Sequence, residues 1–380
     1  MSDSAALRRR HVCGARRLVV KVGTNVLAAP GTPLDESRVA ALAEQIAGLV
    51  GDGRQVALVT SGAIGCGMAE LGLKKRPSTL PMSQAAASVG QGVLMAHYER
   101  HFRSHGLHAA QILLTHEDFD SRSRYLNAAN TIHALFELPC VPVVNENDTI
   151  STAEIQFGEN DRLAALLTHL IRAELLVLLT CAPGLCAERP RAGREARVID
   201  VVERVDEKVK ALVYDEKTAL GVGGMGSKIE AARVTTAAGE AAVIADGRAP
   251  DVLSRLLAGE PVGTLFVPAA GKLSSRKRWL RFTSRPRGTV HVDAGAQAAL
   301  AERGKSLLPS GVTGVEGEFD RGDVVRLKGP GGEEFARGLC NYSHAEVERI
   351  KGRHSSRIAK ILGHKHYDEI VHRDNMALVK

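Results

Sequence analysis

The feature that most constrains the fold is a regular alternation of strand-like and helix-like segments between residues 17 and 267. The strand-like segments are short apolar runs, of which 18–22 is the first. The helix-like segments carry apolar residues three and four positions apart, as 39–50 does after possible capping residues at 35–37. Such alternation predicts a mostly parallel open sheet that is sandwiched by helices on both faces. Further strands are expected at 56–59, 109–114, 141–144, 175–179 and 241–245, and further helices at 63–71, 84–102, 123–136, 163–171 and 228–238.

The pattern changes near Gly271. Beyond it come short alternating runs separated by many glycines, at 289–293, 323–327 and 335–338. A chain of 380 residues is also long enough for two domains. We therefore predict an α/β domain at 17–270, a basic linker at 271–286 and a small β-rich barrel domain at 287–368.

Composition excludes several classes of protein. Hydrophobic residues make up 44% of the chain, but no apolar run approaches the ~20 residues that span a bilayer. The arginine-rich segment 1–16 lacks the apolar stretch of a secretory signal, and we expect it to be a loose tail. The six cysteines form no Cys-x-x-Cys pair, which argues against a metal or redox centre. We expect a cytoplasmic protein that does not bind membranes.

The net charge of +7 favours an anionic partner. Seven basic and no acidic residues lie between 272 and 287, around the single tryptophan, Trp279. This stretch could contact RNA phosphates, but it has few of the aromatic residues on which bases stack. The alternative is a solvated linker or an interface with the first domain.

Two polar clusters follow sheet-like runs. The run 141–144 leads into Asn145 and Asp148, and Asn160 and Asp161 precede the helical pattern that begins at Leu163. Ligands of open α/β sheets bind at the carboxyl ends of the strands. Amide donors together with carboxylates suit a small zwitterion, although Asn, Asp and Gly are also common in ordinary turns.

Glycine-rich turns provide the second indication of a site. The chain has no Gly-x-x-x-x-Gly-Lys-Ser/Thr motif, so the usual nucleotide-triphosphate loop is excluded. Gly221, Gly223 and Gly226, with Asp246 beyond them, have the spacing of a dinucleotide fingerprint, but no strand precedes them directly. The glycines lead instead into Ser227-Lys228 and a helix, which favours a phosphate-binding turn.

Similar turns follow two strands, at Lys21-Val-Gly23 and at 60–65. A lysine within an apolar strand is costly unless it meets an anion. Two lysines, Lys21 and Lys228, could therefore flank a transferring phosphoryl group, and Asp161 could hold them in place. The sequence thus predicts phosphoryl transfer from a nucleotide to a small polar acceptor, with magnesium bridged mainly by the nucleotide phosphates and by no dedicated protein ligand.

These segments together resemble the amino-acid kinase family. The resemblance is carried by the segments 20–24, 59–64, 126–129, 143–148, 158–161 and 223–228. It is closest to the bacterial branch that phosphorylates glutamate and carries a C-terminal PUA domain, and it extends through 341–343 to 372–374. It implies the amino-acid kinase fold, a PUA-like second domain, and transfer of phosphate from ATP to the γ-carboxylate of L-glutamate as the first step of proline biosynthesis. Inhibition by proline and a homo-oligomer, dimer or tetramer, are further expectations.

The resemblance also assigns roles by position. Lys21, Lys228 and Asp161 would be catalytic, with the lysines contacting phosphate and the aspartate orienting them. The residues expected to bind glutamate are Ser61, Asp148, Asn160 and, nearby, Asn145. The residues expected to bind the nucleotide are Lys21, Gly23, Thr180, Cys181, Val222, Gly223, Gly224, Met225, Gly226, Ser227 and Lys228.

Two positions differ from the family pattern. Cys181 stands where an aspartate is usual, and Val222 stands where a threonine is usual. Both flank the expected nucleotide. Rival acceptors within this fold are aspartate, N-acetylglutamate, carbamate and UMP, but the Asn145–Asp148 cluster argues against them. The rival from another class is RNA binding through the C-terminal domain.

Overall fold

The structure is a computed structural model, and it describes residues 3–29, 31–151, 159–188, 196–213, 224–269, 280 and 285–379. The chain divides into two compact units, Met1–Lys272 and Leu273–Lys380. Most of the predicted linker 271–286, including Trp279, lies outside the described residues.

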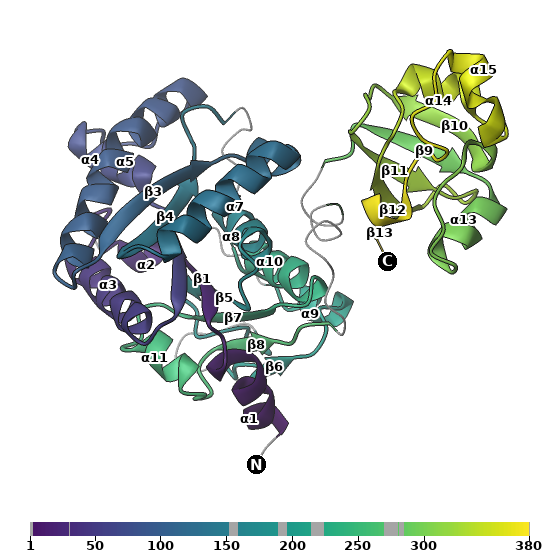
Figure 1. The fold of residues 1–380 in the computed structure, drawn as a ribbon. Helices are drawn as coiled ribbons and strands as arrows, with labels where there is room; N and C mark the ends of the chain where they lie inside the picture. Colours follow the sequence, from purple (N-terminus) through teal and green to yellow (C-terminus); the bar gives the residue numbers. More distant parts are fainter. Residues whose placement is uncertain are drawn as a thin grey trace. The chain divides into compact units, whose positions relative to one another are not determined.

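An eight-stranded sheet forms the centre of the first unit, as Figure 1 shows. Its strand order is β3-β4-β2-β1-β5-β7-β8-β6, and all neighbouring pairs are parallel except β7 with β8. The prediction of a mostly parallel sheet is therefore confirmed. The strands are β1 (Arg17–Val22), β2 (Gln55–Val59), β3 (His108–Leu114), β4 (Cys140–Glu146), β5 (Leu175–Thr180), β6 (Val201–Val202), β7 (Ala241–Asp246) and β8 (Thr264–Phe266).

Helices cover both faces of this sheet. One face carries α3 (Glu36–Gly51), α5 (Leu80–Arg103) and α11 (Val252–Leu257). The other carries α7 (Arg122–Phe136), α8 (Glu159–Leu170) and α10 (Met225–Ala237) (Figure 1). The other α-helices among the described residues of the unit are α1 (Asp3–Arg8), α2 (Thr24–Leu27), α4 (Ala63–Glu70), α6 (His116–Asp120) and α9 (Glu207–Ala211).

Strand β1 divides its side chains between the two faces. Leu18, Val20 and Val22 belong to the apolar core that lies under α3 and α5. Because side chains alternate along a strand, Lys21 points to the opposite face, where α8 and α10 pack. This alternation places a buried lysine beside the two helices that carry Asp161 and Lys228.

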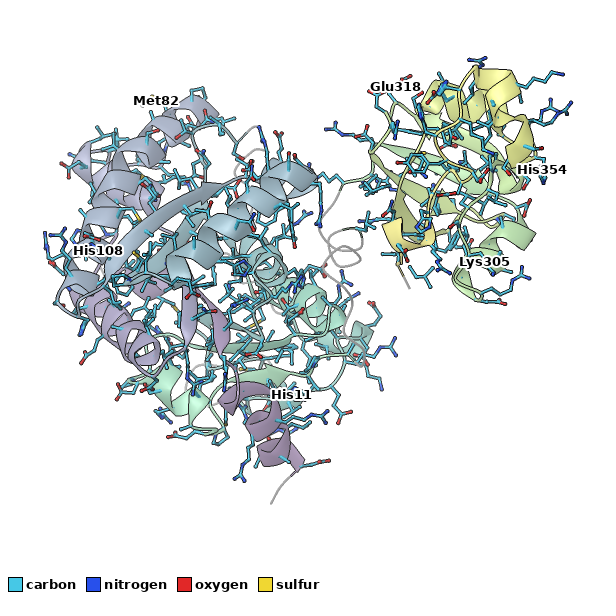
Figure 2. The ribbon with its side chains drawn as sticks, viewed as in Figure 1. His11, Met82, His108, Lys305, Glu318 and His354 are labelled. Atoms are coloured by element: carbon cyan, nitrogen blue, oxygen red, sulfur yellow. The ribbon has the colours of Figure 1, made fainter. Side chains whose placement is uncertain are left out.

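The prediction of a loose tail at 1–16 was wrong for its described residues. They form α1 and a π-helical turn, Arg9–Cys13, in which His11 is labelled in Figure 2. Arg8 is only 1% exposed, and its guanidinium donates to Asp200 Oδ1 (3.0 Å), Val262 O (3.0 Å) and Gly263 O (2.8 Å). These hydrogen bonds fix the segment against the residues that lead into β6 and β8.

Three predicted boundaries shifted at the polar clusters. Strand β4 continues through Asn145 and Glu146, because both residues still pair with β3. Helix α8 begins at Glu159, so Asn160 and Asp161 lie inside its first turn instead of before it. Helix α10 begins at Met225 instead of Lys228.

The second unit is built on a separate five-stranded sheet of order β10-β9-β11-β12-β13, which agrees with the prediction of a β-rich domain. Its strands are β9 (Gly288–Val292), β10 (Val312–Gly317), β11 (Val324–Lys328), β12 (Glu334–Leu339) and β13 (Met376–Leu378), and its helices are α13 (Ala294–Ala301), α14 (His344–Ile350) and α15 (Ile358–Leu362). Short 3₁₀ turns lie at Pro309–Gly311, Ser355–Arg357 and Arg373–Asn375. Across both units, no helix among the described residues is long and apolar enough to cross a membrane.

Candidate active site

The site lies where the parallel strands β4, β2, β1 and β5 end at one edge of the sheet. Lys21 lies near the end of β1, Thr60 and Ser61 follow β2, and Asn145 lies near the end of β4. The first turn of α8 adds Asn160 and Asp161 at this edge. The topology therefore brings together residues that are far apart in the chain.

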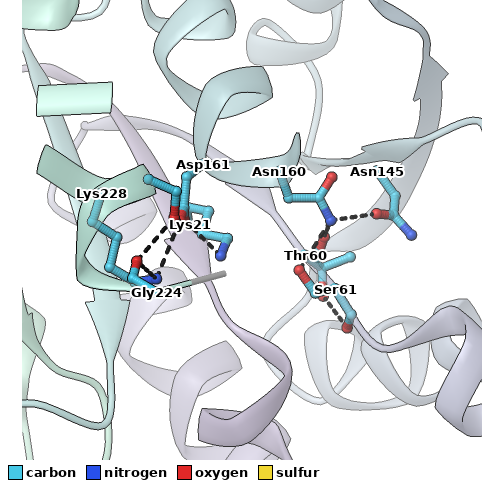
Figure 3. Close-up of polar contacts among 9 residues, drawn as sticks. Lys21, Thr60, Ser61, Asn145, Asn160, Asp161, Gly224 and Lys228 are labelled. Atoms are coloured by element: carbon cyan, nitrogen blue, oxygen red, sulfur yellow. Dashed lines mark hydrogen bonds and ion pairs between the residues drawn. The ribbon is translucent and has the colours of Figure 1, made fainter. Parts of the chain in front are cut away.

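Asp161 is the centre of a buried charge cluster (Figure 3). Its Oδ1 lies 2.7 Å from the Nζ of Lys21, and its Oδ2 lies 3.1 Å from the Nζ of Lys228. Asp161 is 0% exposed, and each lysine is 5% exposed. Two cations on one buried carboxylate leave a net positive charge, which suits an anionic ligand.

The pKa values reflect two opposing effects. Burial alone would raise the pKa of the Asp161 carboxyl, but the ammonium groups of Lys21 and Lys228, with the Ser227 hydroxyl, lower it to about 2. Burial lowers the pKa of Lys21, and the charge of Lys228 adds to this effect while Asp161 opposes it. Asp161 is therefore the group that favours the charged form of Lys21 in its buried position.

The start of α10 provides the phosphate-binding side of the site. Ser227 Oγ donates to Asp161 Oδ2 at 2.6 Å and also lies 2.9 Å from Gly224 O, so the first turn of the helix is tied to the charge cluster. Gly224 is the N-cap and has no side chain to cap the helix. The amides of Met225 and Gly226 belong to this first turn, where helix amides and the helix dipole favour anions. Val222 and Gly223 lie outside the described residues.

A second cluster consists of amides and a hydroxyl (Figure 3). The Nδ2 of Asn160 donates to Thr60 O (2.9 Å), to Ser61 Oγ (2.9 Å) and to Asn145 Oδ1 (3.1 Å). Asn160 and Asp161 are neighbours in the first turn of α8, so the amide cluster lies directly beside the charged cluster. This arrangement fits a ligand with a polar body and an anionic end.

The other predicted residues surround these two clusters. Asp148 is half-buried in the turn after β4. Thr180 ends β5, and Gly23 N donates to Leu179 O of the same strand at 3.4 Å. Cys181 follows Thr180, and its carbonyl oxygen accepts from Arg248 Nη2 at 2.5 Å. Burial raises the pKa of the Cys181 thiol, so the residue is not suited to act as a nucleophile.

Sequence reasoning missed two residues that support the amide cluster. Gln91 of α5 accepts a hydrogen bond from Asn145 Nδ2 at 2.8 Å. Tyr98, also on α5, shares a buried hydrogen bond of 2.8 Å with Thr60 Oγ1. The glycines on either side of Gln91 were a usable signal, because a glycine within a helix often marks close packing. Nothing in the helical pattern indicated which way Gln91 points.

No group of three or more histidine, cysteine, aspartate or glutamate side chains within the described ranges could hold a metal ion.

Comparison with known proteins gives a consistent result. The amino acid kinase family matches residues 16–246, and the PUA domain matches residues 288–362. The glutamate 5-kinase of Moorella thermoacetica is 47% identical over 365 residues, covering 96% of this chain and 97% of that protein. The glutamate 5-kinase of Caldanaerobacter subterraneus is 46% identical over 364 residues, covering 96% of this chain and 98% of that protein.

A third relative, the glutamate 5-kinase of Geobacter sp. (strain M21), is 45% identical over 373 residues and covers 98% of this chain and 100% of that protein. Among solved structures, the UMP kinase of Bacillus anthracis has a TM-score of 0.47 at 14% identity, covering 67% of this chain and 97% of that chain.

Proposed function

The chain belongs to the amino acid kinase family, and from this premise we propose that it transfers the γ-phosphoryl group of ATP to the γ-carboxylate of L-glutamate. The products are γ-glutamyl phosphate and ADP. Full-length relatives that are 44–47% identical carry the name glutamate 5-kinase. The observation that carries the proposal is the pairing of a buried two-lysine centre with a neighbouring amide cluster on one turn of α8.

The reaction needs no general base, because the γ-carboxylate of glutamate, with a pKa near ~4.3, is already ionised at neutral pH. One of its oxygens attacks the γ-phosphorus and forms a new O–P bond. The bond from that phosphorus to the β,γ-bridging oxygen breaks, and its electron pair leaves with ADP. Charge on the transferred phosphoryl group is spread over its oxygens, so the main requirement is positive charge held in a fixed position.

Lys21 and Lys228 supply that charge in this proposal. Their ammonium groups lie 2.7 and 3.1 Å from Asp161, which holds both in place. Because Asp161 is itself an anion, it is not proposed to contact the phosphate. Ser227 fixes the first turn of α10 through its bond to Asp161. The amides of Gly224, Met225 and Gly226 are proposed to bind the nucleotide phosphates. Thr180, Cys181, Gly23, Val222 and Gly223 complete the proposed nucleotide site.

Magnesium is proposed to reach the site on the nucleotide. The described polar groups around the charge cluster are ammonium, hydroxyl and backbone groups. The carboxylate of Asp161 already forms ion pairs with two lysines. This set suits an ion whose ligands are mainly phosphate oxygens and water. When bound, Mg²⁺ would neutralise charge on those phosphates.

Glutamate is proposed to lie against the amide cluster. Asn160 and Asn145 offer amide groups, Ser61 offers a hydroxyl and Asp148 a carboxylate for the substrate ammonium group. A site with this mixture of donors and acceptors rejects ligands that leave its buried polar groups unpaired. Aspartate is one methylene shorter than glutamate, so we expect it to be a poorer acceptor.

The biological setting follows from the same proposal. We place the reaction at the first step of proline biosynthesis in the cytoplasm, with inhibition by proline and a dimer or tetramer as the working form. RNA binding by the second unit stays a prediction, since most of the basic stretch 272–287 lies outside the described residues. A salt-dependent RNA affinity that is lost on removing residues 272–380 would support it.

The test is MgATP-dependent hydroxamate formation in the presence of hydroxylamine, with glutamate, aspartate and N-acetylglutamate as acceptors in parallel. We expect product with glutamate alone. Lys228→Ala should lower kcat at least ~10²–10³-fold, since it removes a charge aimed at the transferred group. Lys351→Ala is the matched control, because that lysine pairs with Glu348 on the surface of the second unit and should leave activity unchanged. A folded protein that makes no hydroxamate with any acid would contradict the proposal.

A further inference from the structure

Two buried amide atoms at the acceptor site have no hydrogen-bond partner among the described residues. They are Nε2 of Gln91, a donor, and Oδ1 of Asn160, an acceptor. A buried polar group without a partner destabilises a protein by ~1–3 kcal/mol, and such groups cluster where a ligand completes the pairing. The inference drawn from them rests on the proposed function and concerns how the acceptor is recognised.

The orientation of each amide is fixed by its neighbours. Asn160 uses its Nδ2 for three acceptors, so its Oδ1 must point away from them. Asn145 Oδ1 accepts from Asn160 and from the amide of Glu146 at 3.0 Å, so Asn145 Nδ2 is the donor to Gln91 Oε1. The Nε2 of Gln91 is consequently left as a free donor. The three amides form a chain with one unused acceptor at one end and one unused donor at the other.

Close helix packing brings Gln91 to this position. Helix α5 touches the start of α4 so closely that a Cβ at Gly90 would lie 1.8 Å from Ala63 O. Helix α4 begins directly after Ser61-Gly62, which follow strand β2. Gln91, the residue after Gly90, therefore lies near the end of that strand. Gln91 is therefore held at the acceptor site by backbone-to-backbone contact, and its position does not depend on a flexible loop.

The order of the three hydrogen-bonded amides indicates how the substrate is oriented in the site. The phosphoryl-transfer end is marked by Lys21 and Lys228 on Asp161, and Asn160 precedes Asp161 directly. Asn145 comes next and Gln91 last. A glutamate whose γ-carboxylate meets the lysines would extend its other end toward Gln91. We propose that Gln91 Nε2 donates to the α-carboxylate of the acceptor and so selects amino acids over acceptors that lack this group.

The alternative is that Gln91 only holds Asn145 in place. The substitution Gln91→Glu separates the two roles. A carboxylate at this position still accepts from Asn145 Nδ2, so a purely structural role survives. The same change replaces the free N–H donor with a negatively charged oxygen, which would repel an α-carboxylate. Recognition of the substrate should therefore fail while the amide chain stays intact.

The experiment measures the dissociation constants of glutamate and of 4-aminobutyrate, which lacks the α-carboxylate, by calorimetry with the folded full-length protein. For Gln91→Glu we expect glutamate to bind at least ~100-fold more weakly, since a repelled charge adds to the lost hydrogen bond. The affinity for 4-aminobutyrate should change less than about threefold, because this ligand has no α-carboxylate for position 91 to contact. Gln45→Glu, the same substitution on α3, is the matched control, because its Oε1 accepts from Leu253 N.

Two further measurements keep the proposal testable. Gln91→Met removes the donor without adding charge, and we expect ~10–100-fold weaker glutamate binding with 4-aminobutyrate spared. A structural role would weaken both ligands alike in this variant. For Gln91→Glu, glutamate affinity should recover partly between about pH 8 and pH 6, since a carboxyl facing another carboxylate has a raised pKa and donates once protonated.

The outcomes separate the two levels of the argument. Wild-type protein that forms no glutamate-dependent hydroxamate would overturn the proposed function itself. Active wild-type protein, together with Gln91→Glu that binds glutamate within threefold of it, would overturn the role of Gln91 alone. Equal losses for glutamate and 4-aminobutyrate in Gln91→Met would also overturn it, in favour of a structural role.

Discussion

Replacing Asp161 by asparagine is the perturbation that reports most on the charge cluster. The amide keeps the size of the side chain but removes the charge that lies 2.7 Å from Lys21 and 3.1 Å from Lys228. At an effective dielectric constant of ~20, each of these charge pairs is worth about 5–6 kcal/mol before the desolvation penalty is subtracted. Removing one partner of a buried pair destabilises proteins by about 3–5 kcal/mol overall.

We therefore expect Asp161→Asn to lower the free energy of unfolding by about 3–5 kcal/mol at neutral pH. The loss does not reach the full Coulomb sum, because one lysine can release its proton. Burial already lowers the pKa of Lys21, and loss of Asp161 would lower it further. A neutral lysine no longer stabilises the phosphoryl group, so kcat should fall by at least ~10³-fold, beyond the loss of a single donor.

The assay combines urea unfolding with steady-state hydroxamate formation at saturating glutamate. Asp251→Asn is the matched control, because Asp251 belongs to the same unit but lies outside the site, at the start of α11. The reasoning is refuted if Asp161→Asn unfolds within about 1 kcal/mol of the wild type, or if its kcat falls less than about tenfold.

Three other predictions address stability. The pKa of Asp161 is about 2 against 3.8 for the free group. A depressed carboxyl pKa stabilises the fold above pH ~3.8, so ~2 kcal/mol of unfolding free energy should be lost between about pH 4 and 2, and acid titration of Asp161→Asn should lack this loss. Arg8→Ala should lower the free energy of unfolding by about 2–3 kcal/mol without changing KM, as urea unfolding and kinetics would reveal; an unchanged urea midpoint would contradict the account of the N-terminal segment. Gly90→Ala should destabilise by about 1–3 kcal/mol, since its Cβ would meet Ala63 O at 1.8 Å. Gly92→Ala, where nothing lies within 4 Å, should be neutral or stabilising by about 0.5–1 kcal/mol, and equal melting shifts for the two would refute the packing argument.

The fold was predictable from the sequence wherever a buried segment has a clear pattern of apolar residues. Strand β1 could be placed because a short, continuous apolar run is typical of a strand that is covered on both faces. The end of β4 could not, because Asn145 and Glu146 have no strand character of their own. They continue the strand through pairing with Leu113 and Leu114 of β3, which is a tertiary interaction.

The candidate site was predictable in its residues but not in its connections. Asn145, Asn160 and Asp161 were identified as site residues, yet nothing in the order of residues indicated that Asn160 would join Asn145 to Ser61. Gln91 was missed because the direction of a helical side chain depends on how α5 packs on α4.

The N-terminal segment illustrates the same limit. Arg8 lies among other arginines in a stretch without an apolar pattern, so the sequence resembles a solvated tail. Its partner Asp200 is 192 residues away, and Val262 and Gly263 are more distant still. Long-range hydrogen bonds of this kind become visible only once the chain is folded.

The central claim is that a γ-carboxylate oxygen of glutamate attacks the γ-phosphorus of ATP. The most direct test uses glutamate labelled with ¹⁸O in both γ-carboxylate oxygens, in the hydroxylamine assay. Hydroxylamine attacks the carbonyl carbon of the acyl phosphate, so the released phosphate keeps the oxygen that bridged carbon and phosphorus. The account predicts one ¹⁸O in each phosphate released with the hydroxamate. Unlabelled phosphate, or ATP turnover that is independent of glutamate, would contradict it.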